Sequence, residues 1–297
     1  MAVVLITGGS GLIGRALTQA LLAQGDEVRW LSRAAGLRNG VRAYAWDVAR
    51  GALDPQALHG VDRIVHLAGA GIADKRWSQR RVAELITSRA ESARLLLRSM
   101  REAGCQPQCI VSASGVGYYG AVTRNTPFTE LDPPGTDTIA RITVEWERAV
   151  DECSALCRVV KLRTPVVLAH EGGALPRLAA LARWGLAAPL GSGKQCMPWV
   201  HIDDLVAAYL RALEDATRQG AYNVIGGNST NLEFTKVLSN ALKRPMWLPR
   251  VPGVLLRIGL GSVADILLHG SPISSRGIAK PLHQDLLQAI EDLLLKK

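Results

Sequence analysis

The 297-residue chain lacks the features that mark membrane and secreted proteins. It has no run of about 18 uncharged apolar residues, which a membrane-spanning helix would need. The most apolar stretch, residues 248–268, is interrupted by Arg250, Arg257 and Asp265. The N-terminal sequence MAVVLITGG has no basic segment of the kind that begins a signal peptide. We therefore expect a cytoplasmic protein with no membrane partner.

Cysteine is scarce, and its number is odd, since the chain has five. This suits a reducing compartment. Cys105 and Cys109, like Cys153 and Cys157, are four positions apart, but neither pair has the Cys-x-x-Cys spacing or a histidine nearby. We interpret these cysteines as small buried apolar side chains and predict no metal site.

Acidic residues are fewer than basic ones, 26 against 35, which gives a net charge of +9. Much of the excess lies in residues 75–101, where arginines alternate with apolar residues as on the solvated face of an amphipathic helix. Bases stack on aromatic side chains in many nucleic-acid-binding proteins, but Trp77 is the one aromatic residue in this stretch. We therefore predict no nucleic-acid partner, while an acidic substrate stays open.

What the chain does contain is a regular alternation of strand and helix patterns. Apolar runs predict strands over residues 3–7, 27–32, 42–47, 63–69, 108–114 and 158–169. Helical spacing follows the first strand and recurs over about 78–103 and 138–153. Together these patterns predict an α/β fold with a Rossmann-type, doubly wound parallel sheet.

Glycine and proline interrupt this alternation after residue 170. We expect a Rossmann domain over 1–165 and a smaller C-terminal substrate lobe over 166–297, ending in a helical segment. A later strand at about 220–227 is expected to join the sheet of the first domain.

The turn after the first strand, TGGSGLIG, is rich in glycine. It fits Gly-x-Gly-x-x-Gly through Gly9, Gly11 and Gly14, and Gly-x-x-Gly-x-x-Gly through Gly8, Gly11 and Gly14. Glycine permits the tight turn and lets the backbone approach a pyrophosphate, and the helix start offers N–H groups to phosphate. Because the turn lies between a strand and a helix, it predicts dinucleotide binding.

The end of the second strand indicates which dinucleotide binds. An NAD-specific site carries Asp or Glu there, which binds the ribose 2′-hydroxyl. This chain has Ser32 and Arg33 instead. A hydroxyl and a guanidinium favour a 2′-phosphate, which a carboxylate would repel, so the prediction is NADP(H). The alternative is that Arg33 is simply an exposed loop residue.

These motifs resemble the extended, epimerase-like form of the short-chain dehydrogenase/reductase superfamily. Longer segments resemble its atypical "epimerase family protein" subgroup, of the SDR39U type, which has a short C-terminal domain. The segments are HLAGAGIADKRW (66–77), SASGVGYYG (112–120), LRTPVVLAHEGG (162–173), PLGSGKQCMPWVHIDDL (189–205) and the LPRVP-containing tail. Pro165 and the pair Ala187-Ala188 depart from the family, which usually has glycine there, so the relatives' pocket shape is not carried over.

The resemblance implies a set of cofactor contacts. It places Asp47 at the adenine edge, although Asp47 would serve equally as a cap of the next turn, and it places Val166 at the nicotinamide. The remaining implied contacts are Gly8, Ser10, Gly11, Leu12, Ile13, Gly14, Ser32, Arg33, Leu67, Ala68, Gly69, Glu84 and Arg89.

The resemblance also shows what is missing from the catalytic motif. Members of the superfamily use a serine after the fifth strand and Tyr-x-x-x-Lys on the next helix, where the tyrosine is the general acid or base. Ser114 matches the serine. No tyrosine of this chain has lysine four residues later, and Ile139 and Thr143 stand in the places of the dyad.

Tyr118, four residues after Ser114, is our candidate for a replacement acid. A tyrosine hydroxyl is a weak acid near neutral pH unless a cation such as Arg89 or Lys194 lies close to it. The alternatives for Tyr118 are lining of the substrate pocket and plain packing.

The segment HIDD (201–204) contains a histidine and two carboxylates, which are residue types that bind metals. Neighbours in an extended segment point to opposite faces, and Asp203 suits a helix N-cap, so we predict a structural role. The alternative is that His201 faces the substrate.

The leading function is an NADP(H)-dependent oxidoreductase or epimerase-like enzyme that acts on an unknown small molecule. The alternative is a non-catalytic NADP(H)-binding sensor or regulator. The serine and the polar segments of the substrate lobe favour the enzyme, and the missing dyad favours the sensor. The sequence does not specify the substrate, the reaction direction or whether the chain forms a homo-oligomer.

Overall fold

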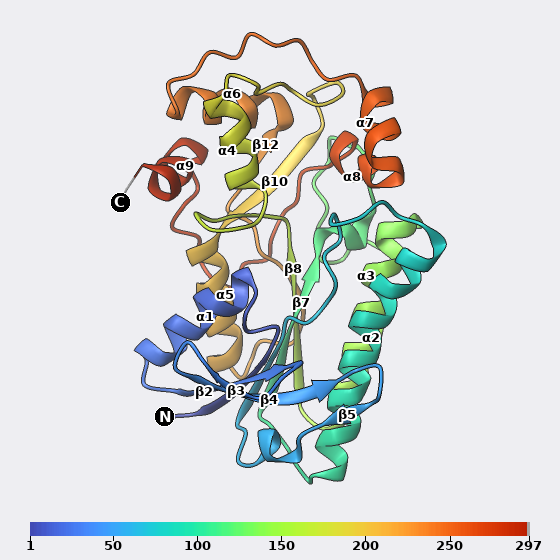
Figure 1. The fold of residues 1–297 in the computed structure, drawn as a ribbon, viewed down its shortest axis with the longest axis vertical. Coiled ribbons are helices and arrows are strands. Elements are labelled where there is room, and N and C mark those ends of the chain that lie inside the picture. Colours follow the sequence, from blue (N-terminus) through green and yellow to red (C-terminus); the bar gives the residue numbers. More distant parts are fainter. Residues whose placement is uncertain (296–297) are drawn as a thin grey trace.

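A largely parallel sheet forms the centre of the protein in a computed structural model that describes residues 1–295 (Figure 1). Its strand order is β11-β8-β7-β6-β1-β2-β4-β3, with β5 paired to β4. Neighbouring strands are parallel except for β3 and β5, which run antiparallel to β4. The strands are β1 (Val3–Thr7), β2 (Glu27–Ser32), β3 (Gly36–Arg38), β4 (Val41–Asp47), β5 (Ala52–Leu53), β6 (Arg63–His66), β7 (Cys109–Gly115), β8 (Arg158–Thr164) and β11 (Gly220–Asn223).

Helices cover both faces of this sheet, which explains why its central strands are continuous apolar runs. α1 (Leu12–Ala23) and α5 (Ile202–Glu214) pack on one face, while α2 (Gln79–Glu102) and α3 (Thr138–Asp151) pack on the other (Figure 1). The order confirms the predicted Rossmann-type, doubly wound sheet. It places the topological switch point between β1 and β6, where ligands bind beyond the carboxyl ends of such strands.

A second, smaller sheet has the order β12-β10-β9. This sheet and the segments that pack around it form the C-terminal lobe. Its strands are β9 (Val166–Leu168), β10 (Cys196–His201) and β12 (Gly227–Thr230), and its helices are α4 (Leu175–Arg183), α6 (Asn231–Ala241), α7 (Gly253–Leu260), α8 (Ala264–Leu268) and α9 (Leu286–Leu294). Short 3₁₀ turns are η1 (Pro55–Leu58), η2 (Val116–Tyr119), η3 (Glu152–Ala155) and η4 (Gly261–Val263).

The single strand predicted over 158–169 is in fact two strands in different sheets. β8 ends at Thr164 in the main sheet, and β9 begins at Val166 in the small sheet. Pro165 lies between them and has no N–H group to continue a ladder. The chain therefore passes from one sheet to the other at this proline. The strand expected at about 220–227 corresponds to β11, which joins the main sheet as expected and ends at Asn223, while Gly227 already begins β12 of the small sheet.

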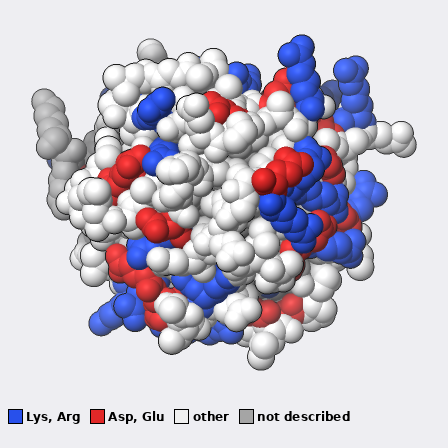
Figure 2. Space-filling model, turned by 90° about the horizontal axis from the view of Figure 1, so that it is seen from below, with Lys and Arg blue, Asp and Glu red and all other residues white. Residues whose placement is uncertain are grey.

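The arginines of α2 do not all lie on a solvated face, as the sequence pattern suggested. Arg81 and Arg89 are each only 6% exposed, because their guanidinium groups donate to the carbonyls of Gly71 and Ala70 after β6. Arg94, by contrast, is partly exposed and pairs with acidic side chains. On the lower face of the molecule, basic and acidic side chains lie side by side (Figure 2). Among residues 1–295, every helix is too short or too polar to cross a bilayer.

A buried histidine joins the switch point to α2. The hydroxyl of Thr7 accepts the N–H groups of Leu67 and Ala68, so its own proton is donated to Nδ1 of His66 at 2.9 Å. His66 Nε2 then donates to Ser92 Oγ at 3.2 Å. Both ring nitrogens are thus used by the neutral imidazole, and burial lowers the pKa of His66 from 6.5 to about 4.

We expect the free energy of unfolding to fall as the pH is lowered from about 6.5 to about 4. In this window the unfolded chain takes up a proton on His66 that the folded chain excludes, which costs at most about 3 kcal/mol. Urea denaturation across this range should show a flatter pH dependence for His66→Asn than for the unchanged protein. The matched control is His59→Asn, at an exposed position. Equal slopes for His66→Asn and the unchanged protein would contradict the interpretation.

Candidate functional site

The glycine-rich turn forms an open helix N-terminus at the switch point. Gly8 has a φ of +71°, and its carbonyl accepts the N–H of Gly11 at 3.0 Å. α1 starts at Leu12, and no side chain caps its first turn. A Cβ on Gly14 would lie 2.5 Å from the carbonyl oxygen of Gly8, so only glycine lets the helix pack on the turn. N–H groups and the positive end of the helix dipole are therefore presented to a phosphate.

Ser32 and Arg33 lie beside this turn. The register of the parallel pair β1–β2 places Thr7 opposite Leu31, so the residues after both strands emerge at the same sheet edge. Ser32 is half-buried and Arg33 is exposed. This location is suited to the predicted contact with a 2′-phosphate.

Asp47 ends β4, two strands away from β1. Its carboxylate accepts the backbone N–H of Arg50 at 3.1 Å and lies 3.6 Å from the guanidinium of the same residue. Asp47 thus caps the following turn, which was the alternative that the sequence left open. Its contact with adenine stays a prediction.

The loop after β6 is held by α2. A Cβ on Gly69 would lie 3.0 Å from the guanidinium carbon of Arg89, so the loop passes close to this side chain. The same guanidinium carbon lies 5.0 Å from the ring centroid of Trp146. Glu84 is largely exposed and pairs with Arg81 at 2.8 Å. Burial lowers the pKa of Arg89 to about 10. Arg89 therefore positions the loop of Leu67, Ala68 and Gly69. Its direct contact with a cofactor stays a prediction.

Ser114, the predicted catalytic serine, donates its hydroxyl to a buried ion pair. Ser114 Oγ lies 2.6 Å from Glu147 Oε1, and Ser114 is only 5% exposed. Glu147 in turn accepts two hydrogen bonds of 2.8 Å from the guanidinium of Arg163. The serine is therefore tied to α3 and β8 in this arrangement.

Arg163 also contacts both tyrosines of the loop after β7. Its guanidinium carbon lies 3.4 Å from the ring centroid of Tyr118, and its Nη1 donates a hydrogen bond to Tyr119 Oη at 3.1 Å. Tyr119 Oη donates to Asn223 at 2.8 Å, and burial raises the pKa of Tyr119. The sequence suggested Arg89 or Lys194 as partners of Tyr118 and missed Arg163, although an arginine within the apolar strand of residues 158–164 was a signal. The contact is with the ring face of Tyr118.

The places of the missing dyad are filled by groups that donate no proton to a substrate. Ile139 is buried and its side chain would meet a Cβ on Gly117 at 2.6 Å. Thr143, one turn later, donates its hydroxyl to the carbonyl of Ile139. Val166, the predicted nicotinamide neighbour, lines the same cavity as Ile139 and Gly117.

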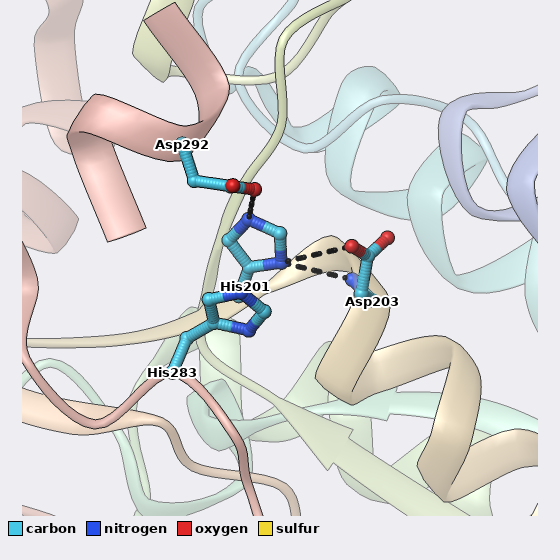
Figure 3. Close-up of side chains that lie close together, drawn as sticks. All are labelled: His201, Asp203, His283 and Asp292. Carbon is cyan, nitrogen blue, oxygen red and sulfur yellow. Dashed lines mark hydrogen bonds and ion pairs between the residues drawn. The ribbon is translucent and has the colours of Figure 1, made fainter. Parts of the chain in front are cut away.

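The HIDD segment forms a different cap from the one predicted. α5 begins at Ile202, and His201 is its N-cap, with Nδ1 accepting the N–H of Asp203 at 3.2 Å (Figure 3). The prediction of Asp203 as N-cap is wrong, because the helix begins two residues earlier than the apolar spacing indicated. The Asp203 carboxylate then lies 3.7 Å from the same ring nitrogen.

Two residues of the C-terminal segment complete this cluster (Figure 3). The ring of His283 stacks on His201 with centroids 3.8 Å apart, and Asp292 lies 3.5 Å from His201 Nε2. One ligand atom from each of the four residues lies within 4.8 Å of the others. However, stacked imidazoles direct their nitrogens in nearly parallel planes, so one ion cannot lie in the plane of both rings. The cluster as built ties the C-terminal segment to α5, and burial lowers the pKa of His201.

The five cysteines are all free, and none is fully solvent-exposed. Cys105, Cys153 and Cys157 lie in or against the core beneath α2 and α3, whereas Cys109 faces the opposite core. Burial raises the pKa of Cys153 to about 12 and that of Cys157 to about 11. These thiols therefore stay protonated at neutral pH, as packing residues do.

Comparisons with known proteins relate this geometry to a family. Residues 4–225 match the model of the NAD dependent epimerase/dehydratase family. Epimerase family protein Mb2239 of Mycobacterium bovis is 38% identical over 95% of this chain and 92% of its own length. The structure of human epimerase family protein SDR39U1 with NADPH has a TM-score of 0.87 and 32% identity, covering 98% of each chain. A nucleoside-diphosphate sugar epimerase from Corynebacterium glutamicum has a TM-score of 0.74 and 29% identity, covering 99% of this chain and 58% of its own.

The buried pair gives a prediction about stability. Glu147→Gln should lower the free energy of unfolding by about 3–5 kcal/mol, because Arg163 is left buried without its counter-charge. Glu145→Gln is the matched control on the same helix, since it breaks the exposed pair with Arg148 and should cost less than about 1 kcal/mol. Urea denaturation measures both. Equal losses of unfolding free energy in the two variants would show that the buried pair stabilises the fold no more than the exposed pair does.

Proposed function

The chain belongs to the NAD dependent epimerase/dehydratase family, and we propose that it is an NADP(H)-dependent oxidoreductase or epimerase-like enzyme. Its resemblance to the "epimerase family protein" subgroup is confirmed by the relatives of that description. The substrate is a small molecule that lies between the main sheet and the C-terminal lobe. The observation that carries the proposal is the uncapped start of α1, beside Ser32 and Arg33 at the switch point.

The cofactor is NADP(H). The family description names NAD, so the choice within the family depends on the end of β2. A serine and an arginine there can donate hydrogen bonds to a 2′-phosphate, and no acidic residue stands in their place. The human relative was solved with NADPH, which supports the same choice.

The enzyme would transfer a hydride between C4 of the nicotinamide and a substrate carbon. Ser114 and Tyr118, after β7, are the proposed catalytic residues. A substrate oxygen would compete with Glu147 for the Ser114 hydroxyl, and the Arg163 guanidinium beside the Tyr118 ring supplies positive charge.

A non-catalytic NADP(H)-binding sensor or regulator is the second candidate. Ile139 and the internally bonded Thr143 favour it, because the usual proton donor and its lysine are missing. A sensor needs the cofactor site but no proton donor, so turnover separates the two candidates.

Arg33→Glu should weaken NADPH binding by at least tenfold, because a charge-assisted hydrogen bond contributes about 1.5–3 kcal/mol and the new carboxylate repels the 2′-phosphate. NADH binding should stay nearly unchanged. Fluorescence titration measures both affinities. Arg38→Glu, at an exposed position of the edge strand β3, is the control for net charge. Equal losses for NADPH and NADH would refute the 2′-phosphate contact.

The two candidate functions differ in their response to substrates. With NADPH present, absorbance should report turnover of at least one member of a panel of aldehydes, ketones and quinones. If Tyr118 or Ser114 takes part, Tyr118→Phe or Ser114→Ala should lower the rate by about 10²–10⁴. Tight NADPH binding without any turnover would favour the sensor. A protein that binds no NADPH would overturn both candidates.

A further inference from the structure

A cavity of about 120 Å³ lies where the end of β7 and the start of α3 meet the C-terminal lobe. It adjoins the place of the missing tyrosine, because Ile139 forms part of its wall. Its lining residues are Val116, Gly117, Tyr119, Gly120, Ala121, Phe128, Ile139, Val166, Cys196, Met197, Pro198, Ile266, His269, Gly270, Ser271 and Ile273.

The lining and the volume restrict the ligand. The wall contains no Asp, Glu, Lys or Arg, so a charged group placed in the cavity would lose its hydration without gaining a counter-charge. An apolar cavity of about 150 Å³ holds a benzene-sized molecule, whereas drug-sized ligands occupy about 300–1,000 Å³. The cavity therefore suits an uncharged molecule of about one ring and is too small to enclose a whole nucleoside-diphosphate sugar.

Most polar groups of the wall are already engaged. Tyr119 donates to Asn223, and Ser271 donates to the carbonyl of Val122 at 2.7 Å. Cys196 directs its Sγ toward Asn228, and burial raises the pKa of this thiol to about 11. None of these three groups is a ready proton donor to a ligand.

His269 differs from them. Its Nδ1 lies 3.2 Å from the carbonyl oxygen of Asp265, to which it donates, and Nε2 has no partner in residues 1–295. The titratable and charged groups around it are Asp265, which pairs with Arg257 of α7, and Cys196, whose backbone lies against the neighbouring Gly270. Protonated at Nε2, the imidazole can donate a hydrogen bond to an oxygen atom in the cavity.

We propose that the cavity binds a small uncharged carbonyl compound and that His269 donates a proton to its oxygen during reduction. The idea rests on the proposed function, because NADPH supplies the hydride. The C4–H bond of NADPH breaks as a C–H bond forms at the carbonyl carbon, and NADPH is oxidised to NADP⁺. The carbonyl oxygen takes the proton from Nε2 to give the alcohol, and the imidazole regains a proton from water. His269 thus takes the role of the missing tyrosine.

The first test measures binding with benzaldehyde, benzoate and UDP-glucose as probes. Calorimetry with the NADP⁺-loaded protein should detect benzaldehyde and show much weaker binding of the two charged probes. Ala121→Leu fills the cavity and should weaken benzaldehyde binding at least tenfold, while Leu131→Ala, at a residue that is 94% exposed, should leave it unchanged. Preferential binding of either charged probe, or no effect of Ala121→Leu, would overturn the proposal.

The second test measures reduction of benzaldehyde in a single turnover with NADPH. His269→Gln should keep benzaldehyde affinity within about threefold and lower the rate by about 10²–10⁴. Bound benzaldehyde that the wild type does not reduce, or an unchanged rate in His269→Gln, would overturn the donor role.

Measurements of cofactor binding distinguish failure of the proposed function from failure of the cavity proposal. NADPH affinity is measured first, and its absence would overturn the proposed function. The benzaldehyde titration is also run without cofactor, so the cavity is tested independently. Loss of benzaldehyde binding in Ala121→Leu with NADPH affinity intact would support the cavity as a separate subsite.

Discussion

The buried ion pair between Glu147 and Arg163 fixes the geometry on which the candidate site depends. It joins α3 to β8 through two hydrogen bonds of 2.8 Å, and both partners are almost fully shielded from water. Such a pair has to be complete, because either charge alone would be costly in this environment. Ser114 and Tyr119 hydrogen-bond to the same two residues, so the loop after β7 is held against α3. The chain then leaves β8 toward Pro165 and the small sheet, which brings the second wall of the cavity into place.

The two ends of the site differ in how they are built. The phosphate end consists of backbone: the turn from Gly8 to Gly14 and the first N–H groups of α1, which need no particular side chain to bind an anion. The substrate end consists of side chains from segments far apart in sequence, such as Ile139 and His269. A backbone site tolerates changes of the side chains around it as long as its glycines are kept, whereas the ligand of a side-chain cavity depends on the residues that line it. This explains why family membership indicates the cofactor more directly than the substrate.

The sequence was sufficient for the features that depend on local pattern. Buried strands, the helices between them and the glycine-rich turn all follow from spacing and residue type. The parallel direction of the strands follows from their alternation with helices. It was insufficient where long-range packing decides. Burial of Arg81 and Arg89 depends on two carbonyl groups of a distant loop, and the role of Arg163 depends on Glu147 of another element. The break at Pro165 had a local signal, but β-branched neighbours on both sides concealed it.

A proton donor at His269 would change how catalysis depends on the fold. In the usual dyad both residues lie on one helix of the nucleotide-binding domain, so their geometry does not depend on the other lobe. His269 instead follows α8, and its neighbour Gly270 approaches β10 so closely that a Cβ would lie 2.0 Å from the carbonyl oxygen of Cys196. The N–H of Cys196 donates to the carbonyl of Gly270, and Ser271 bonds to Val122. These contacts bind the donor to both walls of the cavity, so the relative position of the lobes would set the distance between proton and hydride.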